Sequence, residues 1–99
     1  MNDTIMNYEV IAAVKGPIDP ETGYVIDMKV LKDILKEEVE DPFDHKNLNE
    51  QVEDFKNINP TAENICVVIY DRMKKKLDSS LELKITLYET PRNFVEYSG

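Results

Sequence analysis

Histidine, cysteine and glycine are scarce in this sequence of 99 residues, which contains one histidine, one cysteine and three glycines. A single cysteine cannot form an internal disulfide, and this suits a reducing compartment. One histidine and one cysteine are also too few to build a zinc site from the usual nitrogen and sulfur ligands. The sequence contains no glycine-rich phosphate loop and no Cys-x-x-Cys pair. The commonest metal, redox and nucleotide motifs are therefore excluded.

Basic residues are outnumbered by acidic ones, with 12 Lys and Arg against 20 Asp and Glu and a net charge of −8. Nucleic acids and anionic membranes repel such a chain, so we expect neither as a partner. The sequence has no run of eighteen apolar residues, so no membrane-spanning helix is predicted. Its first residues lack the basic and apolar regions of a secretory signal. We therefore expect one domain over residues 1–99, located in the cytoplasm.

The residues that are present form short periodic segments, which predict an α+β domain. Alternating apolar residues predict strands over 8–15 and 81–87. Apolar residues at helical spacing predict an amphipathic helix over about 28–40. Asp27 is expected as the N-cap of this helix, and Pro42 is expected to end it.

The second predicted helix begins with Thr61 as its N-cap and with Glu63 in the first turn, where the helix dipole favours an acid. A turn over 90–93 and a strand over 94–97 close the chain. The polar region 41–60 is predicted to be mostly loop. A loop of that length is uncommon in a compact domain unless it has a function.

The predicted order of elements is β-α-α-β-β, which gives an antiparallel sheet with two helices on one face. The strand over 8–15 has no neighbour in the sequence with which to form a hairpin. An unpaired strand edge of this kind is usually covered or paired with another chain. We therefore expect a homo-oligomer.

The one histidine, His45, directly follows Asp44 within the polar region 41–60. Histidine has an ordinary pKa near neutrality, and an adjacent carboxylate can orient the ring or raise its basicity. The pair is therefore the first candidate for proton transfer. The alternative is that Asp44 is a turn or capping residue and His45 its exposed neighbour.

Glu89 is a second candidate because it continues the alternation of the strand over 81–87 on the apolar side. A carboxylate at the end of a buried face needs hydrogen-bond donors. A ligand with two parallel N–H groups, such as a pterin or guanine edge, would supply them. The alternative is that Glu89 ends the strand in solvent or pairs with Arg92.

Three further residues have simple structural interpretations. The pattern alone favours Thr61 and Glu63 as helix-start residues rather than ligand contacts. Cys66 falls on or near the apolar face of the second helix, which favours a buried packing residue over a nucleophile.

Four segments together resemble the family of 6-pyruvoyl-tetrahydropterin and 6-carboxy-tetrahydropterin synthases. Each segment alone is weakly specific, whereas four in the same order and at similar spacing are specific. The resemblance extends from residue 7 to residue 99. The segments are GPIDPETGYVIDMKVLK from Gly16, DPFDHKNLN from Asp41, NPTAENI from Asn59 and YETPRNFVEY from Tyr88.

The resemblance implies a tunnelling fold (T-fold), built from a β-β-α-α-β-β unit. It also implies that three subunits join their sheets into a barrel and that two trimers stack into a hexamer. Family members act on 7,8-dihydroneopterin triphosphate, as carbon–oxygen lyases of the biopterin route or as 6-carboxy-tetrahydropterin synthases of the queuosine route. A zinc ion held by three histidines and a Cys-Asp-His proton relay perform the chemistry, and a late glutamate holds the pterin ring.

The family's site residues can be carried over where the segments match. Asp44 and His45 match the aspartate and histidine of the proton relay. Glu89 matches the glutamate that holds the pterin. Thr61 and Glu63 match residues that line the pterin pocket across a subunit interface.

The sequence also departs from the family pattern. The family's first strand, one zinc histidine and the catalytic cysteine have no counterpart here. The family enters its second strand through a Gly-His-Asn-Tyr sequence that another His-Gly precedes. This chain reads Ile5-Met6-Asn7-Tyr8, so Met6 stands where one zinc histidine is expected, and the histidine of the preceding His-Gly is also missing. All three zinc ligands are therefore absent from this chain. We expect a tetrahydropterin synthase homologue that is shortened at its N-terminus and inactive by itself. The alternative is a non-catalytic pterin-binding or scaffold protein, and the sequence does not separate the biopterin branch from the queuosine branch.

Overall fold

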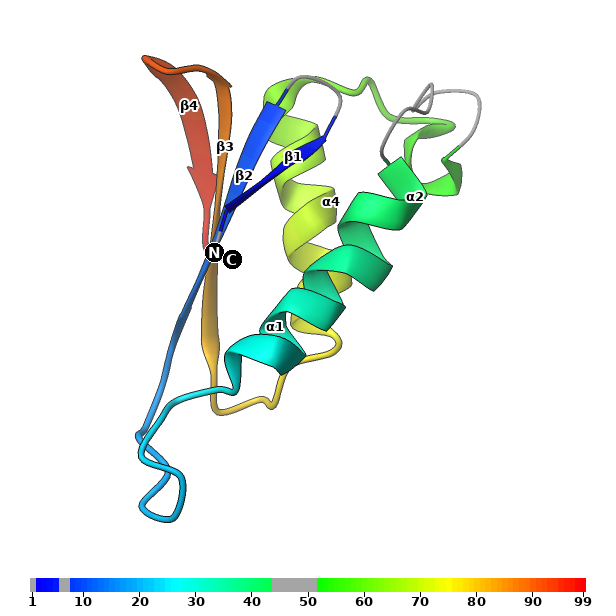
Figure 1. The fold of residues 1–99 in the computed structure, drawn as a ribbon. Helices are drawn as coiled ribbons and strands as arrows, with labels where there is room; N and C mark the ends of the chain where they lie inside the picture. The colour runs from blue at the N-terminus through cyan, green and yellow to red at the C-terminus, as the bar shows by residue number, and fades with distance from the viewer. Residues whose placement is uncertain (1, 6–7, 44–51) are drawn as a thin grey trace.

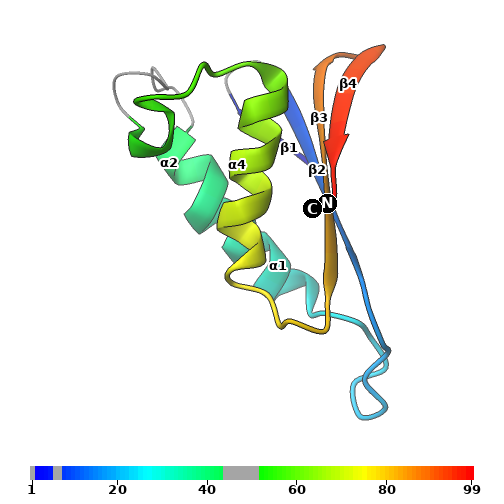
Figure 2. The same cartoon turned by 180° about the vertical axis from the view of Figure 1, so that it is seen from behind.

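A computed structural model describes residues 2–5, 8–43 and 52–99, whose backbone forms an antiparallel sheet with helices on one face (Figure 1). Four strands pair in the order β1-β2-β3-β4. The view from behind in Figure 2 shows the labelled helices on the same side of the sheet. The strands are β1 (Asn2–Ile5), β2 (Tyr8–Lys15), β3 (Glu82–Thr90) and β4 (Asn93–Tyr97).

Two helical stretches cover this face of the sheet. The first consists of α1 (Met28–Leu35), the π-helical segment η1 (Lys36–Glu40) and α2 (Asp41–Phe43). The second is α4 (Ala62–Lys74), and the 3-10 turn η2 (Glu53–Phe55) precedes it. The predicted α+β class with two helices on one face of an antiparallel sheet is confirmed. Among the described residues, no helix has the length and apolar character needed to cross a membrane.

Apolar periodicity explains why these segments pack together. Alternate side chains of β2 and β3 face the helices, and the buried residues of α4 recur at helical spacing. Asp27 and Thr61 cap α1 and α4 as predicted, because each side chain accepts a hydrogen bond from a backbone N–H of the first turn. The buried residues on these three core elements include Val10, Ala12, Ile65, Ile69, Met73, Leu83, Ile85 and Leu87.

Strand β1 corrects one expectation about the sheet. β1 pairs with β2 in antiparallel register, from Asn2 opposite Ile11 to Ile5 opposite Tyr8. The predicted order β-α-α-β-β holds for the elements from β2 onward, but the expectation that strand 8–15 has no hairpin partner is wrong. Strand pairing requires only backbone N–H and C=O groups. A strand of 4 residues can therefore pair although it is too short to show an alternating pattern.

Pro42 does not end the first helical stretch, which continues to Phe43. Proline has no backbone N–H and clashes with the carbonyl four residues earlier in a regular α-helix. The turn before Pro42 is π-helical, and the N–H of Asp41 bonds to the carbonyl of Lys36, five residues back. The wider turn makes room for the proline ring. The helix predicted over 28–40 is therefore longer than the sequence indicates.

The carbonyl of Glu38, four residues before Pro42, accepts a hydrogen bond from a side chain of α4. Arg72 Nε on α4 donates a hydrogen bond to this carbonyl oxygen at 2.6 Å. The region predicted as loop over 41–60 thus begins as helix and contains a further helical turn, η2.

Candidate functional site

The candidate residues come from elements that end on the same side of the molecule. Thr61 and Glu63 lie at the start of α4, and Glu89 lies near the turn between β3 and β4. Both ribbon views place the start of α4, the end of α2 and the β3–β4 turn at one end of the fold, the upper end in Figure 1. The fold thus gathers three of the five predicted site residues at one end.

Glu89 occupies a β-bulge at the end of β3. Tyr88 lies opposite Phe94 on β4, but the register then shifts so that Thr90 lies opposite Asn93. The bulge interrupts the alternation that would place every second residue on the core face. The Glu89 side chain is exposed. The prediction that Glu89 lies on the buried face is therefore wrong within this chain.

The surroundings of Glu89 leave its carboxylate accessible. Within the part of the chain that the structure describes, no ion pair joins Glu89 to Arg92. The turn is held by Thr90 instead, whose hydroxyl oxygen accepts a hydrogen bond from the N–H of Asn93 at 3.1 Å. The carboxylate of Glu89 is thus exposed on a defined turn.

Thr61 and Glu63 begin α4. Thr61 Oγ1 accepts a hydrogen bond from the backbone N–H of Asn64 at 3.2 Å, so its predicted capping role is confirmed. A hydroxyl that accepts a hydrogen bond can still donate its own hydrogen, so Thr61 can both cap the helix and contact a ligand. The Glu63 side chain is exposed in the first turn. Ligand contact by these two residues stays a prediction.

Asp44 and His45 lie outside the described residues, so their role in proton transfer also stays a prediction. The described residues on either side of segment 44–51 are anchored in the core. Phe43 and Phe55 are fully buried, and their rings pack edge to face with centroids 5.7 Å apart.

Arg72 is a residue of this region that the sequence pattern does not single out. Its Nη1 lies 3.1 Å from Asp54 Oδ1, and its Cζ lies 5.2 Å from the centroid of the Phe43 ring. In the sequence it belongs to a basic cluster at the end of a helix, which is typical of residues in solvent. Only its neighbours in space show that it connects α4 with the residues on both sides of segment 44–51.

Cys66 is a buried packing residue, as predicted. Its side chain is 1% exposed, and its Sγ donates a hydrogen bond to the carbonyl oxygen of Ile85 at 3.3 Å. Burial, with a smaller contribution from the charge of Glu96, raises the pKa of the Cys66 thiol from 9.0 to about 11. The thiol is therefore protonated at neutral pH and does not supply a nucleophile.

The donor set of this chain does not fit the zinc site that the family resemblance implies. That site needs three histidines, and the whole sequence contains one. Within residues 2–5, 8–43 and 52–99, no three side chains of His, Cys, Asp or Glu are grouped so that they could hold a metal ion. We therefore assign no zinc ligand to this chain.

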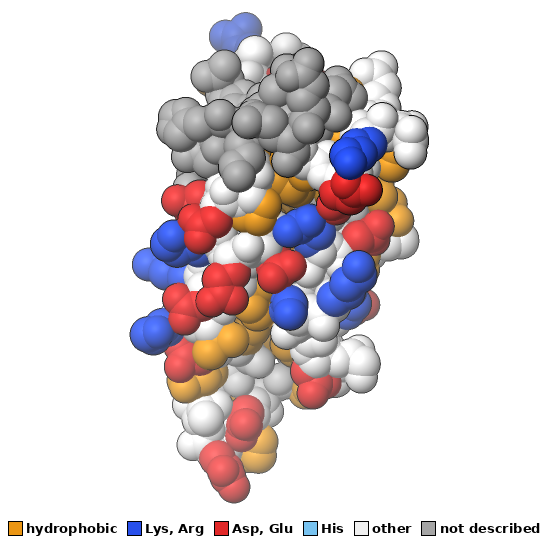
Figure 3. All heavy atoms as spheres, turned by 90° about the vertical axis from the view of Figure 1, so that its right-hand side faces the viewer, with side chains coloured by type: hydrophobic (Ala, Val, Ile, Leu, Met, Phe, Trp, Pro, Cys, Tyr) orange, Lys and Arg blue, Asp and Glu red, His pale blue; other side chains and the backbone are white. Residues whose placement is uncertain are grey.

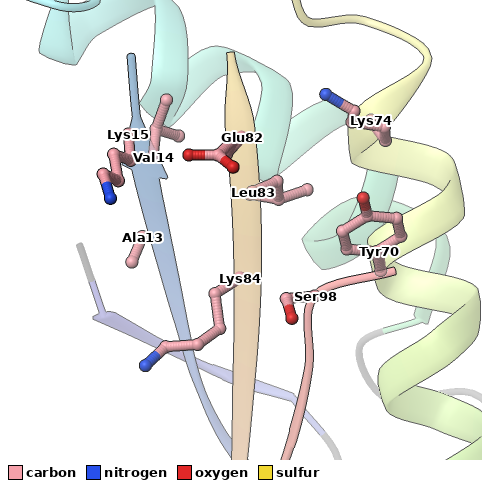
Figure 4. A pocket seen from close by; sticks show the side chains of 9 residues that line it. All are labelled: Ala13, Val14, Lys15, Tyr70, Lys74, Glu82, Leu83, Lys84 and Ser98. Atoms are coloured by element: carbon pink, nitrogen blue, oxygen red, sulfur yellow. The ribbon is translucent and has the colours of Figure 1, made fainter.

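The cavity drawn in Figure 4 does not include the candidate residues that the structure describes. It has a volume of about 470 Å³ and is formed where the end of β2, the start of β3 and α4 come together. Tyr70 and Lys74 of α4 line one side of it, whereas the side chain of Lys84 points away from them. Of the candidate residues that the structure describes, Thr61, Glu63 and Glu89, none lines this cavity. The cavity therefore does not mark the same site.

The helical face of the molecule carries charges of both signs. Figure 3 shows acidic and basic side chains interspersed on this face. Lys29 and Asp33 form an ion pair at 3.1 Å, and Lys36 and Asp41 form another at 2.8 Å. These pairs are exposed and contribute little to stability. Among the described residues on this face, the acidic side chains are thus not gathered in one patch.

Known proteins of one family resemble this chain in sequence. The family model described as 6-pyruvoyl tetrahydropterin synthase matches residues 6–99. The 6-pyruvoyl tetrahydrobiopterin synthase of Pongo abelii is 42% identical over 93 residues, which are 94% of this chain and 64% of that protein. The 6-carboxy-5,6,7,8-tetrahydropterin synthase of Rickettsia conorii is 32% identical over 107 residues, covering 90% of this chain and 78% of that protein.

A solved structure shares the fold as well. The 6-pyruvoyl tetrahydropterin synthase of Caenorhabditis elegans matches with a TM-score of 0.84 and 34% sequence identity, over 93% of this chain and 66% of that chain. The predicted tunnelling fold is thereby confirmed. The chain spans 64% of the length of the Pongo abelii relative.

Proposed function

The chain belongs to the 6-pyruvoyl tetrahydropterin synthase family, and from this membership we propose that it binds the pterin of 7,8-dihydroneopterin triphosphate through the carboxylate of Glu89. Family membership supports a role in tetrahydropterin synthesis. Identity is 42% with the 6-pyruvoyl tetrahydrobiopterin synthase and 32% with the 6-carboxy-tetrahydropterin synthase. This difference favours the tetrahydrobiopterin route over the queuosine route.

The exposed carboxylate of Glu89 is the observation that supports pterin binding. The pyrimidine edge of a pterin presents two parallel N–H donors, and a carboxylate can accept both with its two oxygens. At the bulge, the side chain of Glu89 lies outside the core. Its carboxylate is therefore accessible to a ligand in the free subunit. The packed rings of Tyr88 and Phe94, with centroids 5.1 Å apart, flank the bulge and add apolar surface beside it.

A homo-oligomer would complete the proposed pocket. β1 and β4 are the edge strands of the described sheet, and unpaired strand edges favour pairing with another chain. In the proposed trimer or hexamer, Thr61 and Glu63 of one subunit face Glu89 of another. By the family resemblance, Asp44 and His45 correspond to the proton-transfer pair of the family's site.

Replacing Glu89 by alanine is expected to weaken pterin binding at least about tenfold, because hydrogen bonds to a charged group contribute about 1.5–3 kcal/mol each. Isothermal titration calorimetry with 7,8-dihydroneopterin measures the change. Glu82→Ala is the matched control, since Glu82 is an exposed glutamate at the other end of β3, and it should bind like the wild type. Equal affinity of wild type and Glu89→Ala would refute the assignment of Glu89.

The donor set favours a second candidate function, which is pterin binding without turnover. One histidine in the sequence cannot provide the family's three zinc ligands, and the pKa of about 11 keeps the Cys66 thiol protonated. A pterin-binding or scaffold protein needs neither group.

Turnover of 7,8-dihydroneopterin triphosphate by this chain is expected to be undetectable, and the purified protein should contain less than one zinc per trimer. The reason is that Lewis-acid chemistry requires ligands that this chain does not contain. Elemental analysis and a product assay on the same preparation test both statements. Zinc at one ion per subunit together with turnover would establish the synthase activity and rule out the second candidate.

A further inference from the structure

The cavity between the start of β3 and α4 is lined by a half-buried lysine without an acidic partner. Lys74 lines this cavity, and its Nζ donates a hydrogen bond to the carbonyl oxygen of Leu81. Among the described residues, no ion pair includes Lys74. Asp78, which follows in the sequence, accepts hydrogen bonds from Ser80 instead. The charge of Lys74 is therefore partly removed from water without a carboxylate to balance it.

Tyr70 provides a hydroxyl next to this ammonium group. Tyr70 lies one turn before Lys74 on α4, so the two side chains share a face of the helix. Figure 4 shows the Tyr70 hydroxyl directed toward Lys74 and the Lys74 amine directed toward β3. The ring of Tyr70 packs edge to face against that of Tyr97, with centroids 5.0 Å apart. An O–H and an N–H donor therefore lie together on one wall of the cavity.

The other charged residues that line the cavity already have opposite charges beside them. Lys15 on β2 lies directly opposite Glu82 on β3, and opposite charges in such cross-strand positions attract each other. Lys84 Nζ lies 3.9 Å from Glu96 Oε1 on β4. Lys74 is therefore the charged group of this lining that is left without a counter-charge.

The size and the walls of the cavity suit a small organic molecule. Its volume of about 470 Å³ lies within the usual range for small-molecule sites. Val14 and Leu83 line it with apolar side chains. The cavity thus combines an apolar surface with one unbalanced positive charge.

We propose that this cavity binds a small carboxylic acid, whose carboxylate accepts hydrogen bonds from Lys74 and Tyr70 and whose apolar part lies against Val14 and Leu83. Two donors match the two oxygens of a carboxylate. A phosphate ester carries up to two negative charges near pH 7, of which Lys74 balances only one. The site is separate from the proposed pterin site, because Leu83 and Glu89 lie about 20 Å apart along β3 at the usual rise of a strand.

A titration with benzoate at constant ionic strength, followed by NMR of the backbone amide signals, tests the proposal. Benzoate is expected to shift the signals of Leu83 and Lys74 until they saturate. Benzyl alcohol has the same ring without the charge, and it should bind at least about tenfold more weakly. Phenyl phosphate should also bind more weakly than benzoate. Affinity for benzyl alcohol equal to that for benzoate would refute recognition of an anion, and equal or tighter binding of phenyl phosphate would refute the choice of a carboxylate.

Lys74→Gln is expected to weaken benzoate binding at least about tenfold, because it removes the charged donor. Lys75→Gln is the matched control, since Lys75 is the next residue, is exposed and does not line the cavity. Its affinity should stay within about twofold of the wild type, because exposed charges are screened. Equal losses in the two variants would indicate a general effect of charge and would overturn the proposal.

Tyr70→Phe tests the same site with the smallest change of structure. It removes the hydroxyl and keeps the ring that packs against Tyr97, so it remains informative if Lys74→Gln does not fold. A loss of about twofold to tenfold in benzoate affinity is expected, the usual contribution of one hydrogen bond. Wild-type affinity in Tyr70→Phe, or the absence of saturable benzoate binding to the wild type, would show that the proposal is wrong.

Discussion

Replacing Phe43 by alanine is expected to lower the free energy of unfolding by about 3–5 kcal/mol, the usual cost of removing a buried aromatic ring. Phe43 is fully buried, and it packs against both the Phe55 ring and the Arg72 guanidinium. Its loss would leave a cavity and remove one partner of Arg72. Domains of this size have about 5–15 kcal/mol of stability in total, so the loss would be a large share.

Urea unfolding followed by circular dichroism measures this effect. Phe94→Ala is the matched control, because Phe94 is 51% exposed and its ring packs against that of Tyr88. A loss of about 1 kcal/mol or less is expected for the control. If Phe43→Ala lost as little free energy of unfolding as the control is expected to lose, the packing of Phe43 against η2 would not stabilise the fold.

Alkylation of Cys66 in the folded protein at pH 8 is expected to be at least about a hundredfold slower than that of an ordinary thiol. The pKa of Cys66 is raised from 9.0 to about 11, so the thiolate fraction at pH 8 falls by that factor, and only the thiolate reacts. The side chain is also buried, which slows access further. Iodoacetamide labelling followed by mass spectrometry measures the rate.

The pH dependence of this reaction separates the pKa effect from simple shielding. In denaturant the reaction should increase through pH 9, whereas in the folded protein it should continue to increase toward pH 11. Since the folded state keeps its proton longer, the stability that Cys66 contributes is complete below pH 9 and is lost as the pH rises toward 11. Fast labelling of the folded protein at pH 8 would contradict the assignment of Cys66 as a packing residue.

The parts of the fold that depend on local patterns could be predicted from the sequence. The alternation over 81–87 and the helical spacing over 28–40 follow from the periods of strand and helix, and both segments bury one face. Asp27 and Thr61 are found as caps because capping involves only residues close in sequence.

The parts that depend on distant contacts could not be predicted. The helix continues past Pro42, and Arg72 bonds to the carbonyl of Glu38 across 34 residues of sequence. No local pattern indicates such a donor. The shift of register between Tyr88 and Thr90 is set by the pairing of β3 with β4, and a strand read alone gives no sign of it.

For the candidate site, too, the sequence predicts some residues and not others. The family resemblance identified Glu89, Thr61 and Glu63, and the fold places them at one end of the molecule. The resemblance did not identify Arg72, because its role arises from packing between elements. Asp44 and His45 lie outside the described residues, so the proton-transfer pair stays a prediction from the sequence.

The bulge at Glu89 separates two kinds of sequence change. Leu87 and Ile85 are fixed by the core, where a change of size or polarity disturbs the whole sheet. Residue 89 stands outside that alternation, so its side chain can change without repacking the interior. A substitution at this turn can therefore alter the proposed pterin contact while the core keeps its packing, so binding and stability can change independently.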